Sequence, residues 1–293
     1  MDVLISGVTG LVGSALRSAL EARGDRVVGL GRSGQPSWDR ANNRVNGSLE
    51  GFDAVVHLAG ESIGAGRMND ARKKEILESR TETTRILVDT LSACERKPSV
   101  LVSGSAIGYY GNRGREELLD ENATPGDDFL ARVAKDWEAA ALPIVDAGIR
   151  LALVRTGIVL SRDGGALKKM LTPFRLGVGG KLGNGRQYMS WITLTDEVRA
   201  IMHIIDTPTI SGPVNLTAPH PVTNEVFSKL LGEAVHRPAV IPVPSFALKL
   251  ALGEDLATLL LLQGQRVFPK KLEANGFAFE NVTIEAAFRS LFA

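Results

Sequence analysis

Residues 3–16 read VLISGVTGLVGSAL and place Gly7, Gly10 and Gly13 at three-residue spacing. Apolar β-type residues precede the first glycine, and an amphipathic helical pattern follows the second. The same order of strand and helix continues over the first 160 residues, in which apolar runs alternate with helical patterns. The later runs are RVVGL, DAVVHLA, SVLVSGS and IRLALVRTGIVL. Their near-continuous Val, Leu and Ile predict an α/β fold with a doubly wound parallel sheet, covered by helices on both faces.

Each glycine of this turn has a physical reason. The first permits a tight turn, the second lets the backbone approach a pyrophosphate, and the third lets helix and strand pack closely. Free N–H groups and the helix dipole favour negative charge at the start of the following helix. The turn therefore predicts a Rossmann-type dinucleotide site. The expected contact residues are Gly7, Thr9, Gly10, Leu11, Val12 and Gly13.

The end of the second strand indicates which dinucleotide is bound. In an NAD site this strand usually ends in Asp or Glu, which holds the ribose 2′-hydroxyl. Here RVVGLGRSG ends in Gly31, Arg32 and Ser33 instead. A carboxylate would repel a 2′-phosphate, whereas a guanidinium can bind it through two parallel hydrogen bonds. The sequence therefore predicts NADP, with a solvated loop arginine as the alternative interpretation of Arg32.

Composition limits the classes of partner. The chain has 34 Lys and Arg against 33 Asp and Glu, which gives no general attraction to nucleic acid or to an anionic membrane. A small-molecule substrate is the expected partner, and a homo-oligomer remains open. Cys94 is the only cysteine, which excludes an intramolecular disulfide and fits a reducing cytoplasm. The N-terminus does not resemble a secretory signal, and charged residues interrupt the apolar stretch 245–264, so we expect a soluble protein.

The composition changes after the last predicted strand of this series. From Ser161 the chain becomes rich in Gly and in basic residues, which is typical of loops covering the carboxyl edge of a sheet. We predict an NADP-binding domain over residues 1–160, with its sheet completed by segments near 190–217. Residues 161–293 are predicted to form a smaller α+β part, with a loop-rich substrate cover and a C-terminal helical domain.

Several motifs together resemble a known superfamily. The glycine turn, VVHLAG at 55–60 and VSGSAIGYYG at 102–111 are similar to the extended short-chain dehydrogenases/reductases, which include nucleotide-sugar epimerases. A narrower resemblance is to the atypical "epimerase family" group, which carries a C-terminal domain of unassigned function. Its motifs span nearly the whole chain: LAGESI at 58–63, KKEILESRTETTRIL at 73–87, DWEAAA at 136–141, VRTGIVLSRDGGAL at 154–167, SWI at 190–192 and GQRVFPKKL at 264–272.

The resemblance implies further cofactor contacts. Leu58, Ala59 and Gly60 would line the adenosine and pyrophosphate, and Glu75 and Arg80 on a long helix would reach the cofactor. A guanidinium on a helix that faces the cleft could also serve a phosphate or a ribose hydroxyl. The alternative is that this arginine is exposed and paired with a neighbouring glutamate, Glu78 or Glu82.

One expected catalytic group is missing. In the superfamily, a serine after the fourth strand acts with a tyrosine and with a lysine four residues later on the next helix, the tyrosine being the general acid or base. Here that helix reads DDFLARVAKDWEAAA and contains no tyrosine. The register set by Trp137 and Glu138 places the superfamily's tyrosine at Arg132 and its lysine at Asp136. A register that uses Lys135 instead puts Ala131 at the tyrosine position.

Residues 105–110 are the candidates for the chemistry. Ser105 follows a strand end that should open at the carboxyl edge of the sheet, where it could hydrogen-bond a substrate carbonyl or hydroxyl. Tyr109 and Tyr110 follow directly, and they are two of the three tyrosines of the chain. Either could replace the missing proton donor, or both could be walls of the pocket.

The resemblance places a second group of residues at the substrate cleft. Gln187 and Trp191 flank a segment that faces it, with Arg186 nearby. Arg186 could bind an anionic substrate group, or it could be a solvated loop charge.

The histidines do not indicate a metal site. His57 sits in an apolar strand and is interpreted as a satisfied core histidine. His203, His220 and His236 are scattered without ligand spacing, so no metal is expected.

Two functions remain open. The first is an NADP(H)-binding oxidoreductase or epimerase-like enzyme that transfers hydride to or from a small polar substrate without the usual tyrosine. The second is a non-catalytic NADP(H)-binding sensor or scaffold protein.

Overall fold

A parallel sheet of six strands forms the centre of the molecule, in the order β12-β8-β6-β5-β1-β2. The computed structural model describes residues 1–113 and 117–293. The strands are β1 (Asp2–Ser6), β2 (Arg26–Leu30), β5 (Ala54–His57), β6 (Val100–Ala106), β8 (Arg150–Thr156) and β12 (Gly212–Leu216). Every neighbouring pair is parallel, which confirms the predicted Rossmann-type sheet.

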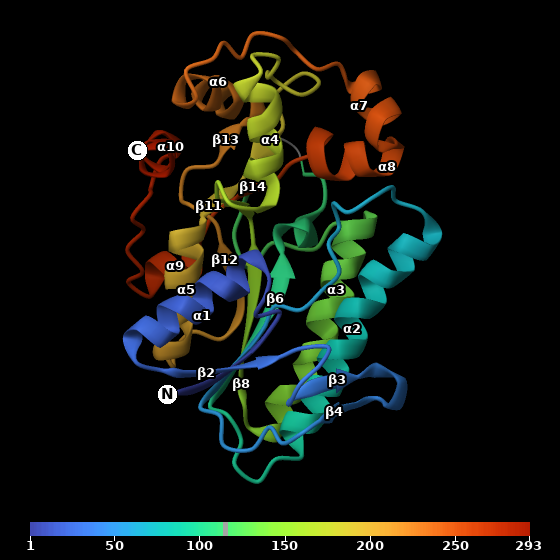
Figure 1. The fold of residues 1–293 in the computed structure, drawn as a ribbon, viewed down its shortest axis with the longest axis vertical. Coiled ribbons are helices and arrows are strands. Elements are labelled where there is room, and N and C mark those ends of the chain that lie inside the picture. Colours follow the sequence, from blue (N-terminus) through green and yellow to red (C-terminus); the bar gives the residue numbers. More distant parts are fainter. Residues whose placement is uncertain (114–116) are drawn as a thin grey trace.

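Helices cover both faces of this sheet (Figure 1). The helices α1 (Leu11–Arg23) and α5 (Leu194–Asp206) lie on one face, and α2 (Asp70–Ser92) and α3 (Phe129–Ala141) lie on the other. Side chains of a strand alternate between the faces. Val3 and Ile5 accordingly belong to the core under α1 and α5, whereas Leu4 belongs to the core under α2. Both cores are almost entirely aliphatic, as the continuous apolar runs predict.

The strand order reverses beside β1. This strand pairs with β2 on one side and with β5 on the other, so the chain leaves the middle of the sheet in both directions. In open α/β sheets, such a reversal leaves a crevice at the carboxyl ends of the strands, and ligands bind there. The glycine turn after β1 lies at this point.

The stretch IRLALVRTGIVL forms two strands rather than one. It breaks at Gly157 into β8 and β9 (Ile158–Leu160), and β9 pairs with β11 (Trp191–Thr193) outside the main sheet. A Cβ on Gly157 would lie 2.7 Å from the Ser190 carbonyl oxygen, so only glycine allows this close approach. The main sheet instead gains β12, which pairs with β8.

Most of the remaining helices lie beyond the carboxyl edge of the sheet, whereas α9 (Lys270–Ala274) lies beside α5 (Figure 1). The helices α4 (Gly165–Arg175), α6 (Asn224–Ala234) and α10 (Ile284–Phe292) share a separate apolar core around Phe227 and Phe288. The helices α7 (Ser245–Leu252) and α8 (Glu254–Ala257) lie above the ends of α2 and α3. An ion pair of 2.6 Å between Lys73 and Asp255 connects α2 to α8.

Short elements connect these parts. They are β3 (Ser37–Asp39), η1 (Arg40–Asn42), β4 (Arg44–Asn46), η2 (Ile107–Tyr110), β7 (Leu118–Leu119), η3 (Leu142–Ala147), β10 (Tyr188–Met189), β13 (Val222–Thr223), η4 (Thr258–Leu262), β14 (Arg266–Val267) and α9 (Lys270–Ala274). The parallel pair of β7 and β14 is the most important for the site, because it joins two segments distant in sequence.

Candidate functional site

The glycine turn is built to hold a group against the backbone. Gly7 has a φ of +75°, and a Cβ there would lie 2.9 Å from the carbonyl carbon of Leu58. A Cβ on Gly13 would lie 2.2 Å from the Gly7 carbonyl oxygen, so the first turn of α1 packs directly on the end of β1. Gly10 is the N-cap of α1 and supplies no side-chain cap. The backbone N–H groups at this helix start therefore stay available for an anion, as a pyrophosphate site requires.

The other predicted residues of the turn have different environments. Leu11 packs against α4, because a Cβ on Gly164 would lie 3.0 Å from its Cδ1 atom. Thr9 is exposed at the turn, and Val12 is half-buried against the core. The turn thus contacts the C-terminal part through Leu11 and the core of the sheet through Val12.

The exits of β2 and β5 lie on either side of this turn. Gly31, Arg32 and Ser33 follow β2, and the Arg32 side chain is exposed to solvent. Leu58, Ala59 and Gly60 follow β5. The Ala59 N–H points to Ser6 Oγ at 3.3 Å, which ties this exit to β1. The turn and both strand exits therefore meet at the carboxyl edge of the sheet, in the arrangement expected of a dinucleotide site.

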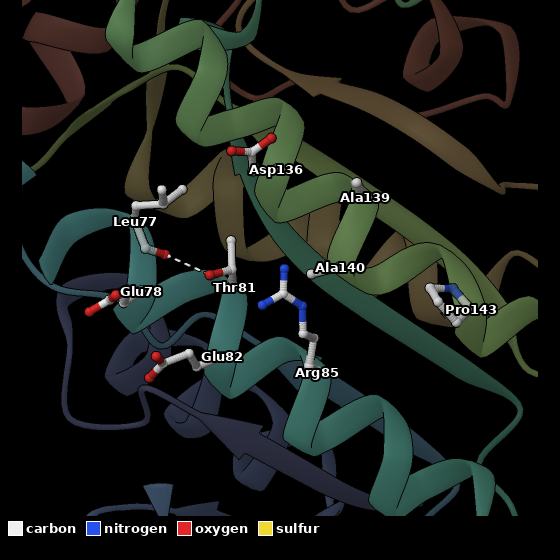
Figure 2. A pocket seen from close by; sticks show the side chains of 9 residues that line it. All are labelled: Leu77, Glu78, Thr81, Glu82, Arg85, Asp136, Ala139, Ala140 and Pro143. Atoms are coloured by element: carbon white, nitrogen blue, oxygen red, sulfur yellow. Dashed lines mark hydrogen bonds between the residues drawn. The ribbon is translucent and has the colours of Figure 1, made fainter. Parts of the chain in front are cut away.

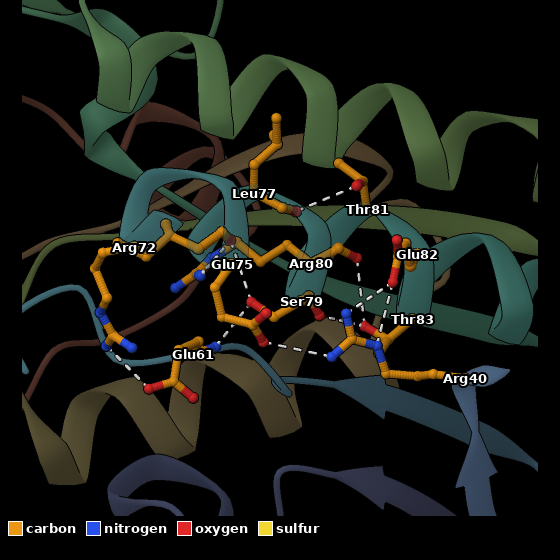
Figure 3. A network of polar contacts seen from close by, with 11 residues as sticks. Arg40, Glu61, Arg72, Glu75, Leu77, Ser79, Arg80, Thr81, Glu82 and Thr83 are labelled. Carbon is orange, nitrogen blue, oxygen red and sulfur yellow. Dashed lines mark hydrogen bonds and ion pairs between the residues drawn. The ribbon is translucent and has the colours of Figure 1, made fainter. Parts of the chain in front are cut away.

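Helix α2 presents two different sides to its surroundings (Figure 3). On the outer side, Glu75 and Glu82 both pair with Arg40, at 3.4 Å and 2.7 Å. Glu75 is therefore already engaged by a cation of the same chain. Figure 3 also shows Arg72 of this helix paired with Glu61, at 2.9 Å, in the loop after β5.

Arg80 lies on the inner side of α2. It is buried, its Nη1 donates to the Ile76 carbonyl oxygen at 2.9 Å, and its guanidinium lies 5.1 Å from the centre of the Trp137 ring. It packs against Gly60, where a Cβ would lie 3.1 Å from its Cζ. Burial lowers the pKa of this guanidinium to about 10. The interpretation of Arg80 as an exposed helix arginine is wrong, since Glu78 and Glu82 pair with other cations.

His57 is a core histidine, as predicted. Its Nδ1 lies 2.6 Å from Ser6 Oγ and its Nε2 lies 3.0 Å from Thr84 Oγ1. Burial, with a smaller effect of the Arg80 charge, lowers its pKa to about 4. The imidazole is therefore neutral at physiological pH.

Ser105 belongs to a buried polar cluster at the carboxyl end of β6. Its Oγ donates a hydrogen bond of 2.6 Å to Glu138 Oε1. Arg155 of β8 donates to both oxygens of the same carboxylate, from Nε to Oε1 at 2.8 Å and from Nη2 to Oε2 at 2.9 Å. Burial opposes the charge of Arg155, but its hydrogen bonds to Glu138 outweigh this and raise the guanidinium pKa above its ordinary value. A buried ion pair of this kind is weak evidence for stability, because desolvation offsets much of the attraction.

The two candidate tyrosines both lie against Arg155, with their ring centres 5.4 Å apart. Tyr110 is fully buried, donates from its hydroxyl to Asn215 Oδ1 at 2.6 Å, and accepts from Arg155 Nη1 at 3.0 Å. Burial raises its pKa to about 12, so Tyr110 releases a proton less readily than an ordinary tyrosine. Tyr109 is half-buried, and the centre of its ring lies 3.5 Å from the Arg155 guanidinium carbon. Both rings thus help to enclose the Arg155 charge.

The C-terminal segment completes this cluster. Asn215 Nδ2 donates to the Phe268 carbonyl oxygen at 3.0 Å. The Glu121 carboxylate accepts from the backbone N–H groups of Asn215 and Lys271, both at 3.1 Å. Residues beyond β14 therefore supply partners to the groups around Tyr110.

The structure places the two residues of α3 that the superfamily alignment selects. Arg132 and Asp136 lie 3.7 Å apart as an i,i+4 pair, and their side chains are 74% and 42% exposed. The buried side of α3 carries Ala131, Trp137 and Glu138. At the level of Ser105, the helix therefore presents a carboxylate.

The predicted substrate residues differ in what they offer. Arg186 is exposed in the loop before β10. Gln187 Nε2 donates to the carbonyl oxygens of Leu182 at 3.1 Å and Leu261 at 2.7 Å, which ties this loop to η4. Trp191 is fully buried in the core shared by α4, α6 and α10, and its Nε1 donates to a backbone carbonyl.

Sequence reasoning missed Glu138 and Arg155 as members of the site. Arg155 stands inside LALVRTGIVL, and a charge in a strand buried on both faces needs a partner. This single charge in an apolar run could have indicated that Arg155 has a buried partner. Nothing in the sequence marked Glu138 as that partner, since acidic residues are common on amphipathic helices.

Other kinds of site receive no support. Within residues 1–113 and 117–293, no group of three or more His, Cys, Asp and Glu could hold a metal ion. None of the described helices is long and apolar enough to cross a membrane. A groove of about 530 Å³ between α2 and α3 lies outside the cluster (Figure 2). It is lined by Glu78, Glu82, Arg85 and Asp136 among others, and no predicted cofactor or catalytic residue borders it.

Comparison with protein families identifies the chain. Residues 3–216 match the model of the NAD dependent epimerase/dehydratase family, and residues 243–291 match a domain of unknown function, DUF1731. The chain belongs to the NAD dependent epimerase/dehydratase family. This agrees with the resemblance to the "epimerase family" group, whose C-terminal domain has no assigned function.

Relatives of this family cover the whole chain. Epimerase family protein Mb2239 of Mycobacterium bovis is 43% identical over 291 residues, which is 97% of this chain and 95% of the relative. The crystal structure of human epimerase family protein SDR39U1 with NADPH is 35% identical, covers 99% of both chains and has a TM-score of 0.93. A nucleoside-diphosphate sugar epimerase from Corynebacterium glutamicum is 35% identical with a TM-score of 0.80, covering 100% of this chain and 58% of that one. The NADPH of the human protein agrees with the NADP predicted from Arg32.

Proposed function

We propose that this epimerase family protein is an NADP(H)-dependent enzyme that transfers hydride to or from a small polar substrate. The observation that carries the proposal is the cluster of Ser105, Glu138 and Arg155 at the carboxyl end of the sheet, in the same α/β unit as the glycine turn. A hydroxyl, a carboxylate and a guanidinium held together in a buried place are unfavourable for stability alone. They are typical of a site that moves protons.

The residues of the crevice fit the cofactor. The backbone after β1 would hold the pyrophosphate, Arg32 the 2′-phosphate, and Leu58, Ala59 and Gly60 the adenosine side. Arg80 would face the cofactor from α2, where its buried charge has one hydrogen bond among the described residues. When bound, the nicotinamide supplies or accepts the hydride. Glu75 would reach the cofactor from the same helix, with the Arg40 guanidinium paired to it.

The substrate would lie between the Rossmann part and the C-terminal part. We propose that residues 1–160 with β12 bind the cofactor and that residues 161–293 cover the substrate. Ser105 would hydrogen-bond the reacting oxygen, and the exposed Arg186 would attract an anionic group. Gln187 would fix the loop before β10 through its hydrogen bonds to Leu182 and Leu261. Trp191 would support the substrate cover by packing in the core beneath it.

A second function has its own support. The segment 266–271 supplies hydrogen-bond partners to Asn215 and Glu121, so the environment of Tyr110 depends on the C-terminal part. A protein that senses NADP(H) and signals through this part would need such a connection. This sensor would bind the cofactor without turnover.

The test is a titration with NADPH and NADH, followed by nicotinamide fluorescence. Aldehydes, ketones, quinones and nucleotide sugars are then added to the NADPH complex. We expect preferential NADPH binding and oxidation of the cofactor by one class. Ser105→Ala should lose about a hundredfold or more in turnover, as expected for a group in proton transfer, and should still bind NADPH. Ser18→Ala, an exposed serine of α1, is the matched control.

The outcomes separate the two functions. Failure to bind either cofactor would contradict both. Tight NADPH binding with no oxidation across the panel would favour the sensor.

A further inference from the structure

A groove of about 520 Å³ opens on the far side of the Ser105 cluster. It runs between α3, η3 and the β8–β12 edge of the sheet. Apolar residues of β8 form its floor, and Leu142 and Val145, each 54% exposed, form its rim. Lys135, Glu138, Tyr109 and Arg155 also line it. The groove is therefore apolar along its length and polar where it meets the cluster.

Glu138 stands between this groove and Ser105. One of its oxygens accepts the Ser105 hydrogen at 2.6 Å, and both are held by Arg155. Because Ser105 donates its own hydrogen to the carboxylate, its lone pairs remain free to accept a proton from another group. The Tyr110 hydroxyl is committed to Asn215 and has a pKa of about 12, so it is poorly suited to the same task.

We propose that Glu138 relays the reaction's proton between Ser105 and the solvent of this groove, in place of the missing tyrosine. The inference rests on the proposed function. When a substrate alcohol is oxidised, its carbon gives a hydride to NADP⁺ and its hydroxyl proton passes to Ser105 Oγ. The former Ser105 proton moves to Glu138 Oε1, and Glu138 then releases it to water in the groove. Reduction of a carbonyl runs these transfers in reverse.

The groups around Glu138 fit this role. Arg155 from β8 fixes the carboxylate through two hydrogen bonds, so the oxygen facing Ser105 keeps its position. Lys135 from α3 and Tyr109 from η2 border the groove beside it, and Ser105 approaches from β6. Arg150, at the other end of the groove, is occupied by the carbonyl oxygens of Ile204, Ile205 and Ile210.

The test compares variants in the NADPH-dependent turnover of the carbonyl compound that the wild-type protein reduces fastest. Glu138→Gln should lower kcat by about a hundredfold to ten-thousandfold, the range of a positioned acid or base. Its NADPH dissociation constant should stay within about threefold of wild type by fluorescence.

Controls separate the relay from a structural role. Glu138→Gln leaves Arg155 buried without its partner, so the double variant Glu138→Gln, Arg155→Met removes both charges and should be equally slow. Asp136→Asn removes a carboxylate of the same helix outside the cluster and should retain wild-type turnover.

The overturning results are distinct. If Glu138→Gln or the double variant kept a turnover within about threefold of wild type, the relay would be wrong and the proposed function would stand. The relay would also be wrong if Glu138→Gln abolished NADPH binding, since the residue would then serve the cofactor. Binding of NADPH without wild-type turnover of any compound would overturn the enzyme and the relay together.

Discussion

Another buried carboxylate, that of Glu197, makes the stability of the protein depend on pH. It lies on α5 beneath the sheet, is 1% exposed, and accepts one hydrogen bond of 2.8 Å from Thr156 Oγ1. Its other oxygen has no partner in the described part of the chain. Burial, opposed by the Thr156 hydrogen bond, raises its pKa to about 8 from an ordinary value of 4.5. The native state therefore keeps a proton that the unfolded chain loses.

The magnitude follows from this difference in pKa. Between pH 4.5 and 8 the native state binds one proton more than the unfolded state, so the free energy of unfolding falls as pH rises. The slope is about 1.4 kcal/mol per pH unit, and the full window gives at most about 5 kcal/mol. The N-terminal position of Glu197 in α5 favours its charged form and reduces this value.

Replacement of Glu197 by Gln should remove the effect, because the amide imitates the protonated acid. We expect urea unfolding at pH 5 to give Glu197→Gln and wild type nearly equal stability. At pH 9 the variant should be more stable by several kcal/mol. Glu233→Gln, at a side chain 59% exposed, should show no such divergence. A difference between Glu197→Gln and wild type that is equal at pH 5 and pH 9 would refute the reasoning.

Three further predictions concern the Rossmann part. Arg32→Ala should weaken NADPH binding by about tenfold or more and NADH binding much less, because a charge-assisted bond contributes about 1.5–3 kcal/mol; equal weakening in fluorescence titrations would contradict the 2′-phosphate assignment. Gly13→Ala puts a Cβ 2.2 Å from the Gly7 carbonyl oxygen, so it should lower both the melting temperature and NADPH affinity, and wild-type values would refute the tight packing. Between pH 6.5 and 4 the unfolded chain binds a proton at His57 that the native state does not, so the free energy of unfolding falls as pH falls. His57→Gln should remove this fall, and an unchanged fall in urea unfolding would show that His57 does not cause it.

The glycine turn was predictable because its requirements are local. Spacing, a preceding strand and a following helix suffice to place Gly7, Gly10 and Gly13, and the structure shows the backbone approaches that they permit. The identity of the nucleotide was also a local inference, from the residue after a strand end. The parallel sheet with helices on both faces followed from the continuous apolar runs, which a strand buried on both faces needs.

The cluster around Ser105 could not be predicted in the same way. Glu138 and Arg155 meet only when α3 packs on β8, and no sequence spacing marks that contact. The buried side of α3 could not be predicted for the same reason, since packing decides which side of a helix faces the sheet. Arg132 is exposed, whereas Glu138 of the same helix is buried against Arg155.

The hydrogen bonds from residues 266–271 have a consequence for biosynthesis. These residues leave the ribosome after every strand of the main sheet, yet they provide the acceptor for Asn215 and a donor to Glu121. A nascent chain can therefore form its sheet, including the Glu138–Arg155 pair, while the surroundings of Tyr110 still lack their partners. We expect the glycine turn to adopt its native structure early in translation. The surroundings of Tyr110 should be completed only when β14 joins β7.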